Sequence, residues 1–204
     1  MRQFVYRRTT FVAGLCAVTL IAAACGGDDT TDDAVSPASS AAVVESAAQA
    51  EPTDVTMMGD QDIEVTLTGP IAIKYASATD AQKEALGMPL TGDHNAGTRE
   101  SGVVFQQFHG GVIIAKNDSP GTPAYVVTSG GIRDAWNTER APDGTPSLTG
   151  KNGSPGPLGV PVTDLTADGD VQEVTFEHGK VTENTATGEV TVTVNGKVVP
   201  AGLR

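Results

Sequence analysis

Few side chains of this 204-residue chain have the type and spacing needed for catalysis or for binding a metal ion. His94 follows Asp93, and His109 and His178 each lie next to a glycine, which is typical of a turn. No two histidines have the His-Glu-x-x-His spacing that places two zinc ligands on one face of a helix. The sequence therefore favours turn residues at these positions, and we predict neither a bound metal ion nor a cofactor.

Motifs for nucleophilic catalysis and nucleotide binding are also missing from the sequence. The chain contains no Gly-x-Ser-x-Gly motif, and the glycine-rich residues 150–159 lack the Lys-Ser/Thr pair of a P-loop. We therefore predict that the protein is not an enzyme. The alternative is a hydrolase with a pair of Asp or Glu side chains about 5–10 Å apart, because the many acidic residues leave room for such a pair.

Aromatic side chains are better candidates for a binding site, because their faces stack on sugar rings while nearby Asp, Asn and Gln bind hydroxyl groups. The candidates are Tyr75, Tyr125 and Trp136. Tyr75 and Trp136 also fit core positions, because each lies four residues after an isoleucine (Ile71 and Ile132) on the same face of a short helix. Both interpretations stay open for these two residues, whereas Tyr125 is the candidate that could be exposed.

The first 24 residues are typical of a bacterial signal peptide. Three arginines precede an apolar run at residues 11–24, which is too short to span a bilayer. The sequence Ala-Ala-Ala-Cys that ends at Cys25 resembles a lipobox, and this resemblance implies that Cys25 is diacylated. Two acyl chains give stable attachment, so we expect a lipid anchor on the extracytoplasmic face of the cell membrane. An ordinary secretory signal cleaved after Ala24 and a twin-arginine route through Arg7 and Arg8 are the alternatives.

Charge and cysteine content exclude several classes of protein. The chain has 25 acidic and 13 basic side chains, with a net charge of −12. Such a surface repels nucleic-acid phosphates and anionic lipid headgroups, so we expect no nucleic-acid partner and no basic membrane-binding patch. The two cysteines, Cys16 and Cys25, lie in or next to the predicted signal, so the folded part is expected to contain no disulfide.

Composition divides the rest of the chain in two. Residues 25–56 are rich in Ala, Ser, Thr and Asp and contain no aromatic residue, so we predict a disordered tether. Residues 57–204 have the length of one ordinary domain.

Within the domain, Thr79 and Gln82 have the spacing of a capping box at the start of a short helix that ends near Leu86. Asn195 and Gly196 between alternating runs indicate a type I′ hairpin. The i, i+3, i+4 spacing of Ile132, Ala135 and Trp136 predicts a helix at residues 132–138. Alternation and apolar runs predict strands at residues 63–68, 103–108, 112–115, 171–176, 180–182, 189–194 and 197–199.

Part of the domain occurs twice. The sequence LGMPLT at residues 86–91 recurs as LGVPVT at residues 158–163, and FHGGVI at residues 108–113 corresponds to FEHGKV at residues 176–181. We therefore predict an internal duplication, with repeat 1 at about residues 69–127, repeat 2 at about residues 130–194 and an insertion around residues 140–155. The shared structural positions are Leu86, Gly87, Pro89, Phe108 and Gly111 in repeat 1, and Leu158, Gly159, Pro161, Phe176 and Gly179 in repeat 2.

Each copy is expected to contain a short helix, a Leu-Gly-x-Pro corner and a β-hairpin. The corner glycine ends the helix in a left-handed conformation, and the proline prevents its continuation. The sequence therefore predicts an α+β fold of two helix–β-hairpin repeats packed together. We expect the N-terminal strand at residues 63–68 and the C-terminal hairpin to cover the ends of the two packed repeats. The alternative is that a second copy of the chain covers them in a dimer.

These landmarks resemble the LGFP repeat of actinobacterial extracellular proteins. The resemblance implies a secreted, wall-associated and non-catalytic protein that binds a cell-wall polysaccharide (arabinogalactan or peptidoglycan) or a wall-associated protein. A protein-binding accessory subunit of a wall-remodelling enzyme is the alternative. Two departures are visible: the aromatic residue of the family's name is Met88 in one copy and Val160 in the other, and the chain has two copies where members often carry several.

Overall fold

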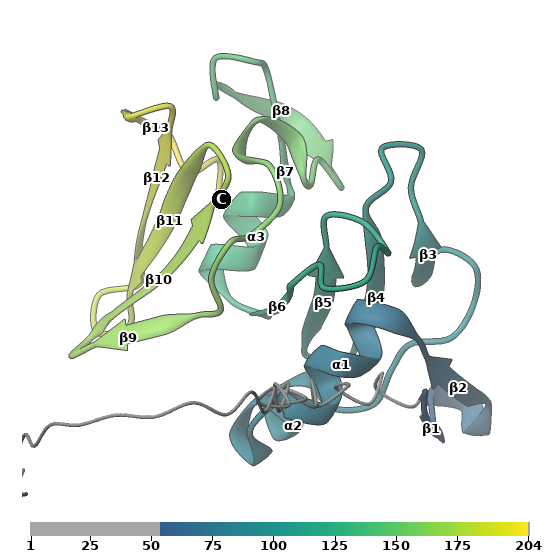
Figure 1. Cartoon of the computed structure of the whole chain (residues 1–204). Coiled ribbons are helices and arrows are strands. Elements are labelled where there is room, and N and C mark those ends of the chain that lie inside the picture. Colours follow the sequence, from purple (N-terminus) through teal and green to yellow (C-terminus); the bar gives the residue numbers. More distant parts are fainter. Residues whose placement is uncertain (1–53, 204) are drawn as a thin grey trace, which may run out of the picture. The chain divides into compact units, whose positions relative to one another are not determined.

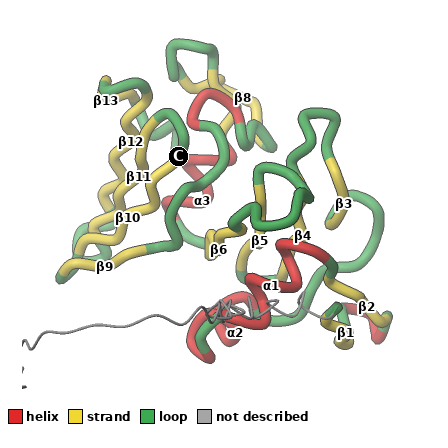
Figure 2. The backbone as a smooth tube through the Cα atoms, viewed as in Figure 1, coloured by secondary structure: helices red, strands yellow, loops and turns green. Residues whose placement is uncertain are grey.

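The computed structural model describes residues 54–203, which form a mixed α+β structure of short helices and antiparallel sheets (Figure 1; Figure 2). The predicted signal peptide, Cys25 and the predicted tether up to residue 53 lie outside the described residues. Among the helices of residues 54–203, none is long and apolar enough to cross a membrane.

The first sheet has the strand order β3-β4-β5-β6 and buries side chains on both faces. Its strands are β3 (Ala96–Thr98), β4 (Val104–Phe108), β5 (Gly111–Ala115) and β6 (Ala124–Thr128). All five residues of β5 are buried, because neighbouring side chains enter two different apolar clusters. This explains why β5 is a continuous apolar run rather than an alternating one.

Two helices and a small two-stranded sheet cover one face of the first sheet and complete the cluster that we call the first apolar cluster. Its buried members include Leu86 and Phe108, and Val65 packs at its margin. The elements are β1 (Val55–Met58), the 3₁₀ turn η1 (Asp60–Asp62), β2 (Glu64–Leu67), α1 (Gly69–Ser77) and α2 (Asp80–Leu86). Strand β1 begins inside the range that the sequence assigned to the tether, because its residues pair with β2 instead of remaining free.

Helix α2 has the predicted start. The Thr79 hydroxyl accepts a hydrogen bond from the Gln82 N–H at 3.2 Å, and the Gln82 side chain accepts one from the Thr79 N–H at 3.0 Å, which confirms the capping box. The helix ends at Leu86 because Gly87 follows with φ 68° and ψ −150°. Gly159 has nearly the same values, φ 78° and ψ −167°. The positive φ was expected, but ψ has an extended value and not that of the left-handed helix. This combination of φ and ψ is essentially restricted to glycine.

The second sheet has the order β13-β12-β11-β10-β9. Asn195 and Gly196 connect β12 to β13 with φ values of 48° and 78°, as a type I′ turn requires. The strands are β9 (Thr166–Asp168), β10 (Val171–Phe176), β11 (Gly179–Asn184), β12 (Glu189–Val194) and β13 (Lys197–Val199).

Helix α3 (Gly131–Asn137) packs on β11 and β12 (Figure 1), and its buried residues share one apolar cluster with residues of the first sheet. Ile132 and Trp136 of α3 belong to one apolar cluster with Val112 of β5 and Val181 of β11. This confirms the helix face that the spacing of Ile132 and Trp136 predicted. Strand β7 (Thr138–Arg140) leads into the predicted insertion and pairs with β8 (Pro146–Lys151) inside it. A 3₁₀ turn, η2 (Gly156–Leu158), precedes the second corner.

Matching contacts surround the two corner leucines. The Leu86 carbonyl accepts a hydrogen bond from the Gly110 N–H at 2.8 Å, and the Leu158 carbonyl accepts one from the His178 N–H at 3.0 Å. Each corner proline lies opposite the phenylalanine that ends the next strand, in the isolated bridges Pro89–Phe108 and Pro161–Phe176.

The turns after these phenylalanines require glycine for steric reasons. A Cβ atom at Gly111 would lie 2.8 Å from a backbone oxygen of β6 and 2.9 Å from Leu86 Cδ2. A Cβ atom at Gly179 would lie 1.9 Å from the Thr193 oxygen and 3.0 Å from Leu158 Cδ2. Because neither glycine has a side chain, the corner leucine and a neighbouring strand can pack closely against each turn. The neighbouring strand is β6 in the first sheet and β12 in the second.

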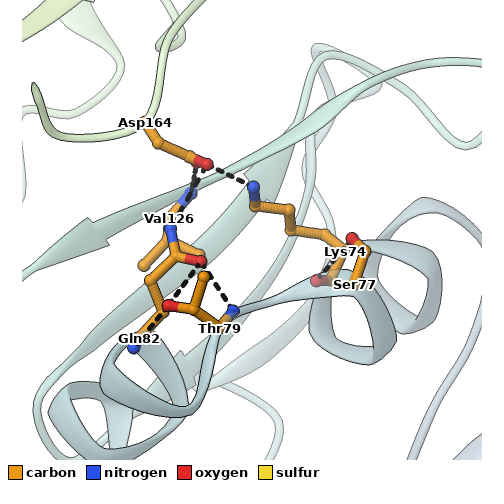
Figure 3. A network of polar contacts seen from close by, with 6 residues as sticks. All are labelled: Lys74, Ser77, Thr79, Gln82, Val126 and Asp164. Atoms are coloured by element: carbon orange, nitrogen blue, oxygen red, sulfur yellow. Dashed lines mark hydrogen bonds and ion pairs between the residues drawn. The ribbon is translucent and has the colours of Figure 1, made fainter. Parts of the chain in front are cut away.

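Asp164 connects the segment after the second corner to the first sheet and its helices (Figure 3). One carboxylate oxygen accepts a hydrogen bond from the Val126 N–H of β6 at 2.9 Å. The other accepts from Lys74 of α1, and from the Gln82 side chain of α2 at 3.3 Å. The Lys74 and Asp164 side chains are only 16% and 29% exposed, so this ion pair is partly shielded from water.

We predict that Asp164→Asn lowers the free energy of unfolding by about 1–3 kcal/mol, because Lys74 loses its partner in a partly buried position. Asp168→Asn, in the exposed strand β9, is the matched control and should change stability by less than about 0.5 kcal/mol. Urea unfolding at neutral pH measures both. Equal stability of the two variants would show that the Asp164 contacts contribute nothing.

Arg140 is a buried cation at the end of β7, with 8% of its surface exposed. Its guanidinium donates hydrogen bonds to four carbonyl oxygens, those of Ala135, Gly144, Pro200 and Ala201, at 2.6–3.1 Å. Burial lowers the pKa of Arg140, because the charged form loses hydration. The side chain thereby joins α3, the β7–β8 turn and the C-terminal segment.

Candidate functional site

A pocket of about 390 Å³ lies between α3 and the face of the first sheet that carries Phe105 and Val112. We call it the amide pocket. Its apolar floor is formed by Phe105, Val112, Ile114 and Trp136. Its polar lining is formed by His94, Asn95, Arg99, Gln107, Arg133, Asn137, Asn152 and Ser154.

Strand register and helix periodicity explain how these residues meet. Phe105 pairs with Ile114 and Gln107 pairs with Val112 across β4 and β5, so all four side chains lie on one face of the sheet. Arg133 and Asn137 are one helical turn apart on α3. Trp136 also lies on α3, and the remaining lining residues come from the loops on either side of β3 and from the chain after β8.

Two arginines give the pocket a positive charge. Arg133 donates hydrogen bonds to the Ser129 hydroxyl and to the Gln107 side-chain oxygen, both at 3.1 Å. Arg99 donates to the Ser154 carbonyl at 2.8 Å and lies over the Phe105 ring, 5.0 Å from its centroid. All of these partners are uncharged, and no acidic residue lines the pocket.

The burial of Arg133 changes its electrostatics. Arg133 is half-buried, and desolvation lowers its pKa because the charged form is less well hydrated than in water. Asp134, its neighbour in the sequence, partly opposes this shift. The ion pairs found within residues 54–203 involve neither Arg133 nor Arg99.

Amide side chains supply both donors and acceptors in the pocket. The Ser154 hydroxyl donates to the Asn137 side-chain oxygen at 3.2 Å, and the Asn137 amide donates to the Asn152 side-chain oxygen at 3.4 Å. Asn95, in the turn before β3, and Gln107 of β4 also line the pocket. Such a mixture of fixed donors and acceptors above an apolar floor suits a ligand with several hydroxyl groups.

The three aromatic candidates lie in three different environments. Trp136 is 4% exposed, packs 5.4 Å from the Phe176 ring centroid and donates its indole N–H to the Gly159 carbonyl, so only its edge contributes to the amide pocket. Tyr75 stacks at 5.8 Å on Phe108, at the margin of the first apolar cluster. A role of these two rings, or of Tyr125, in ligand binding stays a prediction.

Tyr125 lines a second pocket of about 390 Å³, which we call the proline pocket. Its polar lining residues are Lys116, Asn117, Thr122 and Glu177, and the remaining ones are Pro120, Gly121, Pro123, Val160, Pro161 and Val162. Val160, one of the two residues in place of the family's aromatic, therefore lies at this pocket, whereas its counterpart Met88 is 46% exposed.

Glu177 is held in its charged form at the edge of the proline pocket. The Lys116 ammonium donates to its carboxylate at 2.7 Å, and the Val160 N–H donates at 3.3 Å. The hydrogen bond from Lys116 is the main reason that the pKa of Glu177 is lower than its usual 4.5. A lowered pKa contributes stability above pH 4.5, which is lost as pH falls through the lower folded value.

Glu177→Gln is therefore expected to reduce stability at pH 7 by less than about 1 kcal/mol, since Lys116 is mostly exposed. The same variant should lose less stability than the wild type between pH 5 and pH 3. Urea unfolding across this pH range provides the test. An unchanged acid dependence would mean that the Glu177 carboxylate has the same pKa in both states.

The histidines and carboxylates are dispersed. His109 and His178 are exposed in the β4–β5 and β10–β11 turns, and His94 is exposed at the amide pocket. Within residues 54–203, no group of three or more His, Cys, Asp or Glu residues is placed to hold a metal ion. A third pocket, beside β2 and β3, contains Asp118 as its single acidic residue, so none of these three pockets is lined by two carboxylates.

Sequence reasoning missed the polar residues of the amide pocket, above all Arg99, Gln107, Arg133 and Asn137. One local signal was available: Arg133, Trp136 and Asn137 have i, i+3, i+4 spacing and so lie on one side of α3. The contribution of β4 was not visible, because Gln107 on its own is typical of any solvent-facing strand position.

Comparison with known proteins gives one family match. The sequence pattern described as the LGFP repeat matches residues 86–144, from the first corner through β3–β6 and α3 to the β7–β8 turn. No curated protein matches the chain. All residues that line the amide pocket, except Asn152 and Ser154, lie within the matched segment. An LGFP repeat is thus present at residues 86–144, and its family indicates a protein associated with the cell envelope.

Proposed function

We propose that this chain is a non-catalytic, lipid-anchored cell-envelope protein whose LGFP repeat binds a wall polymer, arabinogalactan or peptidoglycan. The observation that carries this proposal is that the LGFP segment itself builds nearly the whole amide pocket. A repeat whose only role was structural would not need a polar pocket of this size on its own surface.

The pocket has the features that a saccharide needs. Phe105 and the edge of Trp136 provide apolar contact area, and the asparagines and Gln107 provide hydrogen-bond partners at fixed positions. Its volume lies within the roughly 300–1,000 Å³ typical of small-molecule sites. No residue pair in the pocket offers a general acid and base, which favours binding over hydrolysis.

A second LGFP-like copy, from Leu158 onwards, is part of the proposal. It is supported by the matching corner hydrogen bonds, proline–phenylalanine bridges and glycine contacts. The face of the second sheet that corresponds to the Phe105 and Val112 face of the first sheet is polar. Glu173 and Lys180, an ion pair at 2.8 Å, stand in the positions of Phe105 and Val112. A polar outer face is what ends a stack of repeats.

Diacylated Cys25 and the tether complete the proposed arrangement on the extracytoplasmic face of the cell membrane. A lipid anchor keeps the LGFP segment close to the wall, which raises the effective concentration of both partners. Each contact with the polymer can therefore be weak. The strongly acidic composition fits this arrangement, since attachment depends on acyl chains and not on a basic surface.

Co-sedimentation tests this function. The full chain, kept soluble in mild detergent, is mixed with insoluble wall material before and after removal of arabinogalactan. We expect sedimentation with at least one of the two preparations, and their difference identifies the polymer. If the chain stays in the supernatant with both preparations, wall binding is wrong and a protein partner becomes the better explanation.

A further inference from the structure

We infer that the amide pocket binds a sugar unit that carries an anionic group, a carboxylate or a phosphate, in preference to a neutral sugar. This inference rests on the proposed function and narrows it. Among wall polymers it favours one whose sugar units carry carboxylate or phosphate groups over a neutral arabinan or galactan chain.

The first argument is the charge of the lining. The whole chain contains 25 acidic and 13 basic side chains, yet the pocket contains two arginines and no acidic residue. In such an acidic chain, a carboxylate could be placed beside each of these arginines. Leaving Arg99 and Arg133 without a carboxylate at the same pocket gives it a local positive potential that attracts anions.

The second argument is the state of the two guanidinium groups. Arg133 uses two of its five N–H groups on Ser129 and Gln107, and Arg99 uses one on the Ser154 carbonyl. These neutral acceptors orient the groups without neutralising them. Free N–H groups remain on both arginines for a planar carboxylate or a phosphate, the anions that a guanidinium fork fits best.

The third argument is the partial burial of Arg133. Arg133 is a half-buried cation that belongs to none of the ion pairs found within residues 54–203, and its neighbour Asp134 offsets only part of the lost hydration. An incoming anion recovers more of this electrostatic energy. The Gln107 side-chain oxygen holds Arg133 at the junction of α3 and the first sheet. The asparagines and the apolar floor nearby are then available for the sugar ring itself.

The single tryptophan of the chain makes the test specific. Trp136 lines the amide pocket, so its fluorescence reports on this site. The full chain is titrated with three sugars that share one ring: N-acetylmuramic acid, N-acetylglucosamine 1-phosphate and neutral N-acetylglucosamine. Calorimetry under the same conditions detects binding that leaves the fluorescence unchanged.

At least one anionic sugar is expected to bind about tenfold or more tightly than N-acetylglucosamine, and to weaken as salt is added. Preference for the carboxylate or for the phosphate identifies the source of the anionic group. Equal binding of the neutral sugar, or no binding of either anionic sugar, would overturn the inference.

Variants assign the effect to the pocket. Arg99→Gln changes an exposed side chain and should weaken anionic-sugar binding about tenfold, and Arg133→Gln should do so as well. Lys197→Gln in exposed β13 removes the same charge outside the pocket and should leave binding unchanged. If Arg99→Gln binds like the wild type, the arginines are not the anion-binding groups.

The failure of this inference and that of the proposed function are distinguishable. A chain that sediments with the wall but does not distinguish anionic from neutral sugars retains the proposed function and loses only the anion preference. A chain that neither sediments nor binds any of the three sugars contradicts both.

Discussion

Replacing Phe176 with alanine is expected to lower the free energy of unfolding by about 3–5 kcal/mol. Phe176 is 2% exposed and lies in the apolar cluster that joins α3 to both sheets. Its ring packs on Trp136 at 5.4 Å, and its backbone forms the bridge to the second corner at Pro161. Removing the ring leaves a cavity in the middle of this cluster, which neighbouring side chains fill only in part.

Urea unfolding, followed by the fluorescence of Trp136, measures this effect. Phe176→Leu is the matched control, because it keeps most of the buried apolar volume and should cost less than about 1.5 kcal/mol. An alanine variant that is as stable as the leucine variant would show that the buried volume at position 176 does not stabilise this cluster.

The second large effect concerns Arg140. Arg140→Met is expected to lower the free energy of unfolding by about 3 kcal/mol, because buried carbonyl groups lose their donor. The loss of four charge-assisted hydrogen bonds is partly offset, since the cation no longer has to be desolvated. The methionine side chain fills similar space, so the change reports mainly on polar contacts.

Two further variants separate charge from geometry at this site. Arg140→Lys keeps the positive charge but lacks the planar guanidinium that reaches several carbonyls. Its free energy of unfolding should therefore lie between that of Arg140→Met and that of the wild type. Glu139→Gln, at the exposed neighbouring position, should change stability by less than about 0.5 kcal/mol. Wild-type stability of Arg140→Met in urea would contradict the proposed role of the buried guanidinium.

Local chemistry explains which parts of the fold could be predicted from the sequence. The capping box at Thr79 and the Asn195-Gly196 turn depend on contacts within a few residues, and both were predicted. The alternating strands β2, β10 and β12 were found because one face of each is more exposed than the other.

The elements that were missed depend on distant contacts. Strand β6, with the sequence AYVVT, has no free face, and three-residue strands such as β3 and β9 are too short to show a period. Strand β8 lies in the predicted insertion, which has no counterpart elsewhere in the sequence to guide a prediction. Strand β1 is recognisable only through its pairing with β2.

The candidate site was harder to predict than the fold. Its polar residues come from four separate parts of the chain, around residues 94–99, 105–114, 133–137 and 152–154, and only tertiary packing brings them together. The sequence indicated Trp136 but not its arginine and asparagine neighbours. Sequence patterns identify the LGFP repeat, whereas the chemistry of its pocket requires the structure.

The most direct test of wall binding through the amide pocket compares two full-length proteins and a control variant in one co-sedimentation experiment. One is the wild type, and the other carries Arg99→Gln and His94→Ala, two exposed positions at the pocket. We predict that the wild type and a Lys197→Gln control sediment with the insoluble wall, while the double variant stays in the supernatant. Equal sedimentation of the double variant and the wild type would contradict the central claim that this pocket holds the polymer.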